Sequence, residues 1–164
     1  MNPSSVVRKQ AVEEVLSGPI LVHGPRSELF ESSFTEFTGA PYAISVSSCT
    51  AGMHLIYHAL GFGPGDEVIV PAVSWSTTYH PLQQYGLKLK IVDIDLNTLN
   101  LDISKLEDVL SERTRAIMPV SILGNPANLD VIRHFANKHS LYFIEDNCES
   151  LDAELDGKKA GTYG

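Results

Sequence analysis

Several features that mark common protein classes are scarce in this chain of 164 residues. Its two cysteines, Cys49 and Cys148, lie far apart and form no CxxC pair, which is typical of a reducing compartment rather than of a disulfide scaffold. No apolar run reaches the roughly 18 residues needed to cross a bilayer. The opening residues, MNPSSVVRKQAVEEVL, lack the continuous apolar core of a signal peptide. We therefore expect a cytoplasmic protein with no membrane partner.

Positive charge is also scarce. Lys and Arg number 12 against 20 Asp and Glu, which gives a net charge of −8 without any block of like charge. Nucleic acids bind basic faces, so we expect no nucleic-acid partner. The GxGxxG and GxxxxGK[ST] patterns are both missing, which excludes the standard dinucleotide and P-loop fingerprints.

What the sequence does contain is an alternation of helical patterns with short β-branched runs. Apolar residues at helical spacing before Gly18 and before Gly39 predict two amphipathic helices at the start of the chain. Five runs predict strands, at residues 43–46, 67–73, 89–94, 115–120 and 141–146. The segments between them are too long for hairpins. We therefore expect an α/β fold, a mainly parallel sheet with helices on both faces.

Ligands of such sheets bind outside the carboxyl ends of the strands. The first of these ends is SVSSCTAG, residues 45–52, which leads into a helical pattern. Ser48, Cys49 and Thr50 would lie at the helix start, where backbone N–H groups and the helix dipole favour a phosphate. A helix cap that binds no ligand explains the same residues.

Two further strand ends carry unusual residues. Trp75, the only tryptophan, follows the run 67–73. It suits stacking on a planar ligand, although core or interface packing is the simpler alternative. Asp146 ends the run 141–146, where a carboxylate reached through apolar residues needs a cation or a protonated nitrogen. Capping of the following turn is the alternative for Asp146.

Taken together and in order, these segments resemble the DegT/DnrJ/StrS family of pyridoxal-phosphate sugar aminotransferases. The resemblance runs from about residue 20 to 164 and is carried by five stretches. These are SVSSCTAGMHLIYHALGFGPGDEVIVPAVSWSTT, IVDIDLNTLNLD, TRAIMPVSILGNPANLD, FIEDNCES and GKKAGTYG. It implies the large-domain fold of this enzyme class, with residues 1–40 as a helical segment and 41–164 as part of the cofactor-binding domain.

Position by position, the resemblance implies where the cofactor, pyridoxal 5′-phosphate (PLP), would bind. Its phosphate would lie against the backbone at Ser48, Cys49 and Thr50, and Trp75 would stack on the pyridine ring. The family normally has Gly where Cys49 stands, so the approach of the backbone to the phosphate differs here.

The same resemblance implies two catalytic carboxylates. Asp146 would pair with the protonated pyridine nitrogen and keep it charged, so that the ring can accept electrons. Glu149 falls where the family has Gln or Glu near the phenolic oxygen of the ring. Cys148, between them, is interpreted as a small packing residue, because a thiolate beside carboxylates is disfavoured.

The family implies a nucleotide-linked keto sugar as substrate, an amino-acid donor, a homodimer and a role in making polysaccharide or lipopolysaccharide precursors. The lysine that carries the cofactor follows the stretch matched by GTYG, so we expect this chain to be the amino-terminal part of a larger enzyme and inactive alone. The resemblance also implies a carboxy-terminal small domain that we expect to lie outside this chain. A histidine at that lysine position marks the related sugar 3-dehydratases, which LGNP and IEDNCE resemble more closely. The sequence as a whole nevertheless slightly favours transamination over 3-dehydration.

Other residues of the chain have types or spacings that also occur in metal or catalytic sites. His54 and His58 have the spacing of a metal pair, but HLIYH has no Glu after its first His, which favours packing or surface roles. Asp93 and Asp95 are best explained as organisers of a turn. A catalytically silent binding module and a cysteine hydrolase using Cys148 remain alternatives of other classes.

Overall fold

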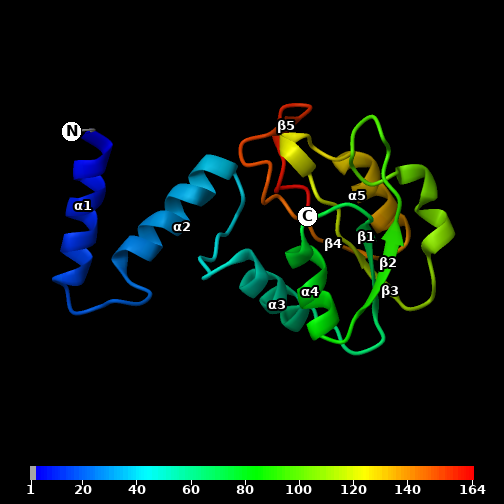
Figure 1. Cartoon of the computed structure of the whole chain (residues 1–164), viewed down its shortest axis with the longest axis horizontal. Helices are drawn as coiled ribbons and strands as arrows, with labels where there is room; N and C mark the ends of the chain where they lie inside the picture. Colours follow the sequence, from blue (N-terminus) through cyan, green and yellow to red (C-terminus); the bar gives the residue numbers. More distant parts are fainter. Residues whose placement is uncertain (1–2) are drawn as a thin grey trace. The chain divides into compact units, whose positions relative to one another are not determined.

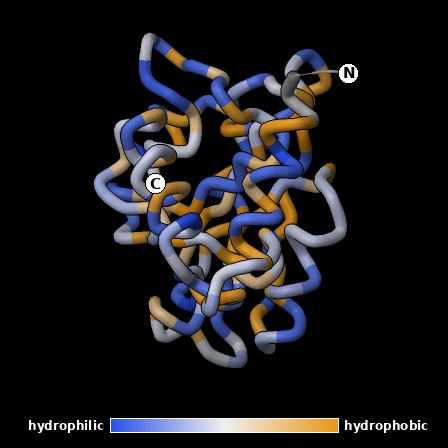
Figure 2. The backbone as a smooth tube through the Cα atoms, turned by 90° about the vertical axis from the view of Figure 1, so that its left-hand side faces the viewer, coloured by the Kyte–Doolittle hydropathy of each residue, from blue (hydrophilic) through white to orange (hydrophobic). Residues whose placement is uncertain are grey.

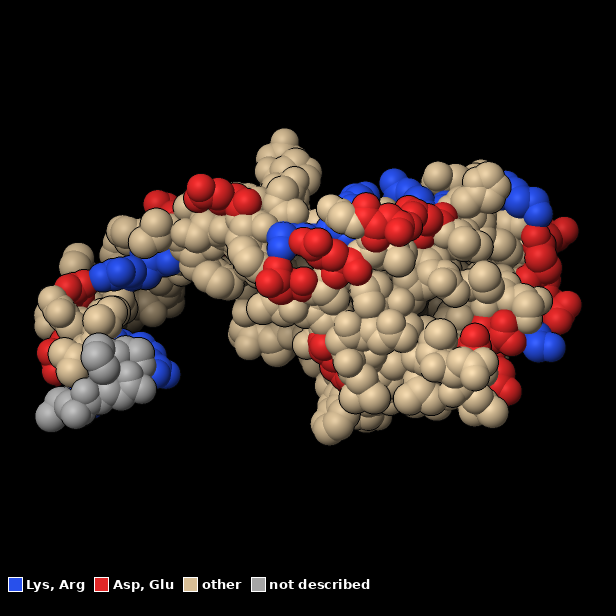
Figure 3. Space-filling model, turned by 90° about the horizontal axis from the view of Figure 1, so that it is seen from above, with Lys and Arg blue, Asp and Glu red and all other residues tan. Residues whose placement is uncertain are grey.

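The protein's architecture comes from a computed structural model, which describes residues 3–164. The chain divides into two compact units, Met1–Ser45 and Val46–Gly164 (Figure 1). No helix in the described part of the chain is long and apolar enough to cross a membrane. On the face seen in Figure 3, acidic and basic side chains are interspersed.

The first unit contains the two helices that the sequence predicts, α1 (Pro3–Leu16) and α2 (Pro25–Thr38). Pro25 lies in the first turn of α2, where a missing N–H costs nothing, and the helix ends at Gly39 with a left-handed φ of 75°. The Glu31 carboxylate accepts hydrogen bonds from the backbone N–H and the hydroxyl of Ser45, at 2.7 and 2.6 Å. This contact fixes the end of the unit to α2.

The second unit is built on a parallel sheet of four strands in the order β2-β1-β3-β4. The strands are β1 (Glu67–Pro71), β2 (Lys88–Val92), β3 (Thr114–Ile117) and β4 (Tyr142–Phe143). All four overlap runs that the sequence predicts as strands, with β2 and β3 each beginning one residue earlier, so the parallel sheet is confirmed. A short antiparallel hairpin, β5 (Glu154–Leu155) with β6 (Lys158–Lys159), follows.

Helices cover both faces of this sheet. The helices of this unit are α3 (Cys49–Ala59), α4 (Ser76–Gln84), α5 (Leu129–Lys138) and the short 3₁₀ helices η1 (Ile103–Lys105), η2 (Glu107–Val109) and η3 (Ile122–Gly124). Val68 and Val70 pack into a core cluster with Tyr57 of α3. Ile69, between them, packs into the opposite cluster with Ile132 of α5. Alternating side chains of β1 thus pack into two cores. In Figure 2, hydrophobic and hydrophilic stretches alternate along the backbone.

The prediction of a strand at residues 43–46 is wrong. Within residues 3–164, this segment forms neither a strand nor an isolated β-bridge. Ile44 is 80% and Val46 42% exposed. β-branched residues favour extended backbone, but a strand also needs a partner, and no strand of residues 3–164 pairs with this one.

The carboxy-terminal residues are tied to the end of β4 by Glu145. Its carboxylate accepts backbone N–H bonds from Gly161, at 2.7 Å, and from Tyr163 and Gly164. Asn147 also donates to the carbonyl of Ala160 at 3.1 Å. The segment that matches GKKAGTYG is therefore held beside the segment after β4 that carries Asp146.

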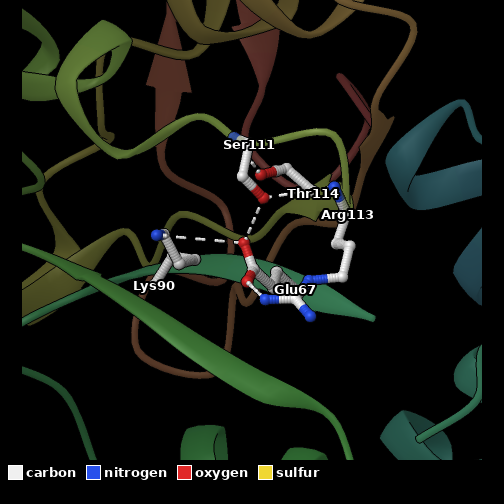
Figure 4. A network of polar contacts seen from close by, with 5 residues as sticks. All are labelled: Glu67, Lys90, Ser111, Arg113 and Thr114. Carbon is white, nitrogen blue, oxygen red and sulfur yellow. Dashed lines mark hydrogen bonds and ion pairs between the residues drawn. The ribbon is translucent and has the colours of Figure 1, made fainter. Parts of the chain in front are cut away.

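A buried carboxylate also anchors the amino end of β1 (Figure 4). Glu67 is only 4% exposed and accepts a 2.6 Å hydrogen bond from the Ser111 hydroxyl. Arg113 lies 3.4 Å and Lys90 3.8 Å from its oxygens. The Ser111 hydrogen bond, more than the two cations, holds the pKa of Glu67 below its ordinary value of 4.5. This network joins β1 to β2 and to the turn before β3.

We predict that Glu67→Gln lowers the free energy of unfolding by about 1 to 3 kcal/mol at pH 7, because buried hydrogen bonds to a charge are lost. A lowered pKa contributes stability above the unfolded value and loses it as pH falls through the folded value. The difference between the two proteins should therefore shrink below about pH 4.5. Urea unfolding followed across pH measures it.

The matched control is Glu107→Gln, because Glu107 pairs with Lys138 at 2.6 Å but is exposed. Glu107→Gln should lower the free energy of unfolding at pH 7 clearly less than Glu67→Gln does, since solvent screens an exposed ion pair. Equal losses for the two variants would contradict the assigned role of Glu67.

Candidate active site

A cavity of about 260 Å³ opens beside the carboxyl ends of β1, β3 and β4. Its walls include Trp75, Thr78, Asp146, Cys148 and Glu149. These residues come from the start of α4 and from the segment after β4. All of them except Thr78 are discussed as candidate residues from the sequence alone. The fold brings the five together at one edge of the sheet.

Asp146 is held by the continuation of the β3–β4 pairing. Its backbone N–H donates to the carbonyl of Pro119 at 3.0 Å, its carbonyl accepts from the N–H of Ser121 at 3.2 Å, and it forms a parallel bridge with Val120. The residue is 6% exposed. Strand pairing therefore delivers a carboxylate into the wall of the cavity rather than into a solvent-facing turn.

The Asp146 carboxylate is satisfied by two neutral donors. Oδ2 accepts from the Thr78 hydroxyl at 2.8 Å and Oδ1 from the backbone N–H of Cys148 at 3.3 Å. Thr78 has a single hydroxyl proton, so the 2.7 Å contact between Ser74 and Thr78 must run with Ser74 as donor. No ion pair to Asp146 occurs within residues 3–164. A buried carboxylate without a cation is the feature expected of a site for a protonated nitrogen.

Thr78 is the functional candidate that the sequence reasoning missed. It is 1% exposed and lies on the buried face of α4, together with Pro81 and Leu82. The sequence could have indicated Thr78, because its hydroxyl has the helical spacing of the buried residues Pro81 and Leu82. Ser76 and Thr77 precede it, however, and a run of Ser and Thr at a helix start is usually interpreted as a cap.

Trp75 precedes the first residue of α4 and is 70% exposed. Of the two simpler explanations from the sequence, packing of Trp75 in the core of this chain is therefore wrong, whereas packing at an interface stays an alternative. An exposed indole in a cavity wall offers a flat apolar surface to a ring-shaped ligand.

The start of α3 contacts the cavity wall through Cys49. Ser48 caps the helix, because its hydroxyl accepts the N–H of Ala51 at 3.1 Å. Cys49 is the first residue of α3 and Thr50 the second, so their backbone N–H groups lie at the positive end of the helix. The Cys49 Sγ lies 3.1 Å from the Sγ of Cys148. Of the three predicted phosphate-binding residues, Cys49 thus contacts Cys148, which lines the cavity.

Glu149 also lines the cavity, but one of its oxygens is engaged. Its Oε2 accepts the backbone N–H of Leu123 at 2.9 Å, and Leu123 has a positive φ of 54°. The carboxylate therefore fixes the backbone at Leu123, in the turn after β3. A second lone pair remains on each oxygen for a ligand.

The thiol of Cys148 is poorly suited to nucleophilic chemistry. Partial burial, a hydrogen bond with Asp146 and the nearby Cys49 raise its pKa well above the ordinary value. Burial, and then the charge of Asp146, likewise raise the pKa of Tyr57 beneath the site. The cysteine hydrolase alternative needs a thiolate, so this environment counts against it.

The remaining candidates lie elsewhere. His54 Nε2 is 3.0 Å from the side chain of Gln84, and His58 Nδ1 is 3.1 Å from the hydroxyl of Tyr85. Each histidine thus contacts the end of α4 instead of a shared ion. Asp93 and Asp95 accept backbone N–H bonds from Ile94 and Asn97, at 2.8 Å each, and organise a turn as expected.

Comparison with known proteins identifies the group to which this site belongs. The sequence model of the DegT/DnrJ/EryC1/StrS aminotransferase family matches residues 5–164. The chain belongs to this family. The resemblance inferred from the sequence motifs is therefore confirmed.

Two relatives in the DegT/DnrJ/EryC1/StrS family show the range of similarity. The chain is 45% identical over 160 residues to the GDP-4-keto-6-deoxy-D-mannose 3-dehydratase of Yersinia pseudotuberculosis, covering 94% of this chain and 41% of that protein. It is 39% identical over 154 residues to the UDP-4-amino-4-deoxy-L-arabinose–oxoglutarate aminotransferase of Shewanella sediminis, covering 94% and 40%. The chain thus spans about two fifths of the length of these relatives.

A solved structure in the same family confirms the fold. The E. coli GDP-4-keto-6-deoxy-D-mannose-3-dehydratase with bound hydrated PLP superposes with a TM-score of 0.87 at 44% identity. The match covers 95% of this chain and 42% of that one. The predicted α/β fold of PLP-dependent enzymes is therefore correct.

We predict that iodoacetamide alkylates Cys148 more slowly than a cysteine in an unstructured peptide at pH 7, because the raised pKa of the thiol lowers the fraction of reactive thiolate. Asp146→Asn should speed the reaction, since it removes the adjacent charge. Peptide mass spectrometry separates Cys148 from Cys49. Alkylation at the peptide rate would refute the assigned environment.

Proposed function

We propose that this chain forms the cofactor-binding part of a PLP-dependent enzyme that acts on a nucleotide-linked keto sugar. The observation that carries the proposal is the buried Asp146 carboxylate, held by neutral donors in a cavity wall beside an exposed indole. The proposal extends to a cytoplasmic role in making cell-surface polysaccharide or lipopolysaccharide precursors, which is the expectation for the family.

The residues around the cavity fit the cofactor. Asp146 would face the protonated ring nitrogen, with Thr78 fixing the carboxylate in the direction of the ring. Trp75 would cover one face of the ring. The α3 start, at Cys49 and Thr50, would take the phosphate on backbone N–H groups. When bound, PLP supplies an electron sink for a carbanion at the substrate.

Glu149 has a supporting role in this proposal. Its carboxylate, oriented by the N–H of Leu123, would tune the hydrogen bonding of the ring's phenolic oxygen. Orientation by a backbone group keeps the side chain in one position, which a surface glutamate would not otherwise hold. The turn after β3 would move with it if that contact were lost.

Between the reactions of the family, sugar 3-dehydration is favoured. The dehydratase of Yersinia pseudotuberculosis is 45% identical to this chain, against 39% for the Shewanella aminotransferase. The transamination preferred from the sequence as a whole becomes the second candidate, with an amino-acid donor for either reaction. The name of the dehydratase indicates a GDP-linked 4-keto-6-deoxy sugar as the substrate class to test first.

We predict that PLP quenches the fluorescence of Trp75, the only tryptophan of the chain. Asp146→Asn should raise the dissociation constant at least about tenfold, because a hydrogen bond between charged groups contributes about 1.5 to 3 kcal/mol. Cys148→Ala should change it much less. Equal effects of the two substitutions, or no saturable quenching of the unmodified chain, would sink the proposal.

We also propose that the protein is a homodimer. The helices of the first unit expose large apolar side chains, among them Leu16 at 67%, Leu29 at 56% and Phe30 at 58%. Several large apolar side chains exposed on one folded unit favour an interaction surface there. A second copy of the chain is the partner that the family leads us to expect.

Sedimentation velocity should therefore find a dimer that Phe30→Asp shifts toward monomer. The matched control is Ser33→Asp, which adds the same charge at an exposed polar position of α2. A monomer at all concentrations, or equal dissociation by both substitutions, would contradict this role of Phe30.

A further inference from the structure

Cys49, Cys148 and Asp146 form a cluster that the proposed chemistry leaves unused. One sulfur or oxygen from each lies within 4.8 Å of the others. Cys49 comes from the first turn of α3, whereas Cys148 and Asp146 come from the segment after β4. It is the only group of three such side chains found among the described residues. We propose that these three residues bind a divalent cation of the zinc class.

The spacing of the donors suits such an ion. Zinc–thiolate bonds of about 2.3 Å in a tetrahedral site place two sulfurs about 3.8 Å apart, so the sulfurs, now 3.1 Å apart, would separate by about 0.7 Å. Asp146 supplies the third ligand, and the cavity side leaves a fourth position open for water. Three protein ligands with one open position is a common zinc arrangement.

Charge favours a cation at this point. The described residues place no Lys or Arg in an ion pair with any of the three groups. A bound cation deprotonates a coordinating thiol. Binding therefore releases two thiol protons to solvent and involves no change of oxidation state.

The donor types select the ion. Thiolates are soft ligands that favour Zn²⁺, Cd²⁺ and Co²⁺ over Mg²⁺ and Ca²⁺, which prefer oxygen. The histidine pair on α3 does not contribute, because His54 and His58 contact side chains of α4.

Metal and cofactor would exclude each other. Asp146 cannot ligate a cation and face a protonated ring nitrogen at once, and Cys49 occupies the helix start proposed for the phosphate. This exclusion rests on the proposed function, whereas metal binding itself does not. Zinc would thus act as an inhibitor that holds the chain in a form without PLP.

Cobalt titration of the reduced chain tests the metal site. We expect one equivalent of Co²⁺ to give a near-ultraviolet thiolate-to-metal absorption band, which one equivalent of Zn²⁺ removes. Cys49→Gly, which restores the usual family residue, and Cys148→Ser should each weaken binding by at least about tenfold and reduce the band. Far-UV circular dichroism confirms that the variants are folded, and Cys49→Ser provides a second variant at that position.

The matched control is the double variant His54→Ala/His58→Ala, which should bind Co²⁺ as the unmodified chain does. Absence of the band in the unmodified chain would overturn the proposal. So would a band that survives both cysteine substitutions or disappears with the histidines.

PLP titration in the presence of Zn²⁺ tests the exclusion. Zn²⁺ should raise the apparent dissociation constant for PLP in proportion to its concentration, and Cys148→Ser should abolish that dependence. Independent binding of the two would overturn the exclusion. Zinc binding together with no PLP binding at all would instead refute the proposed function and leave the metal site supported.

Discussion

The site depends on one interaction, the hydrogen bonding that keeps the Asp146 carboxylate buried and oriented. Moving a carboxylate out of water costs several kcal/mol unless donors or a cation replace the water. Here the Thr78 hydroxyl and the N–H of Cys148 replace part of it. The remaining deficit is what makes a protonated ring nitrogen, or a divalent cation, a favourable neighbour.

The two buried carboxylates of the sheet illustrate this difference. Glu67, at the amino end of β1, is satisfied within the chain by Ser111, Arg113 and Lys90. Asp146, at the carboxyl end of the sheet, has only neutral donors. The first arrangement stabilises the fold, and the second leaves an unbalanced charge where parallel sheets bind their ligands. Charge balance, more than burial, therefore separates the structural carboxylate from the one that we propose binds a ligand.

Local patterns predict much of this molecule, because helical spacing and β-branched runs report local preferences. They identify both opening helices, four of the strands, and Trp75 and Asp146 as unusual residues at strand ends. They fail at residues 43–46, where the backbone preference is present but no strand of the described chain pairs with it. Whether a run of residues forms a strand depends on a partner elsewhere in the chain, and the run itself does not identify that partner.

The contacts that define the site are also tertiary. Thr78 and Asp146 are 68 positions apart, and Cys49 and Cys148 are 99 apart. Only the register of the sheet and the packing of α3 and α4 bring them together. Motif resemblance located the first and last of these segments, but it assigned no role to Thr78, because a hydroxyl that acts through a carboxylate leaves little trace in a short motif.

The most direct test of this account is a double-mutant cycle on Thr78 and Asp146 with PLP affinity as the readout. If Thr78 acts by orienting the carboxylate, Thr78→Val should weaken binding in the unmodified chain and have almost no effect in an Asp146→Ala background. Full additivity of the two losses would show that Thr78 acts independently, and would contradict the claim that an oriented, buried Asp146 organises the site.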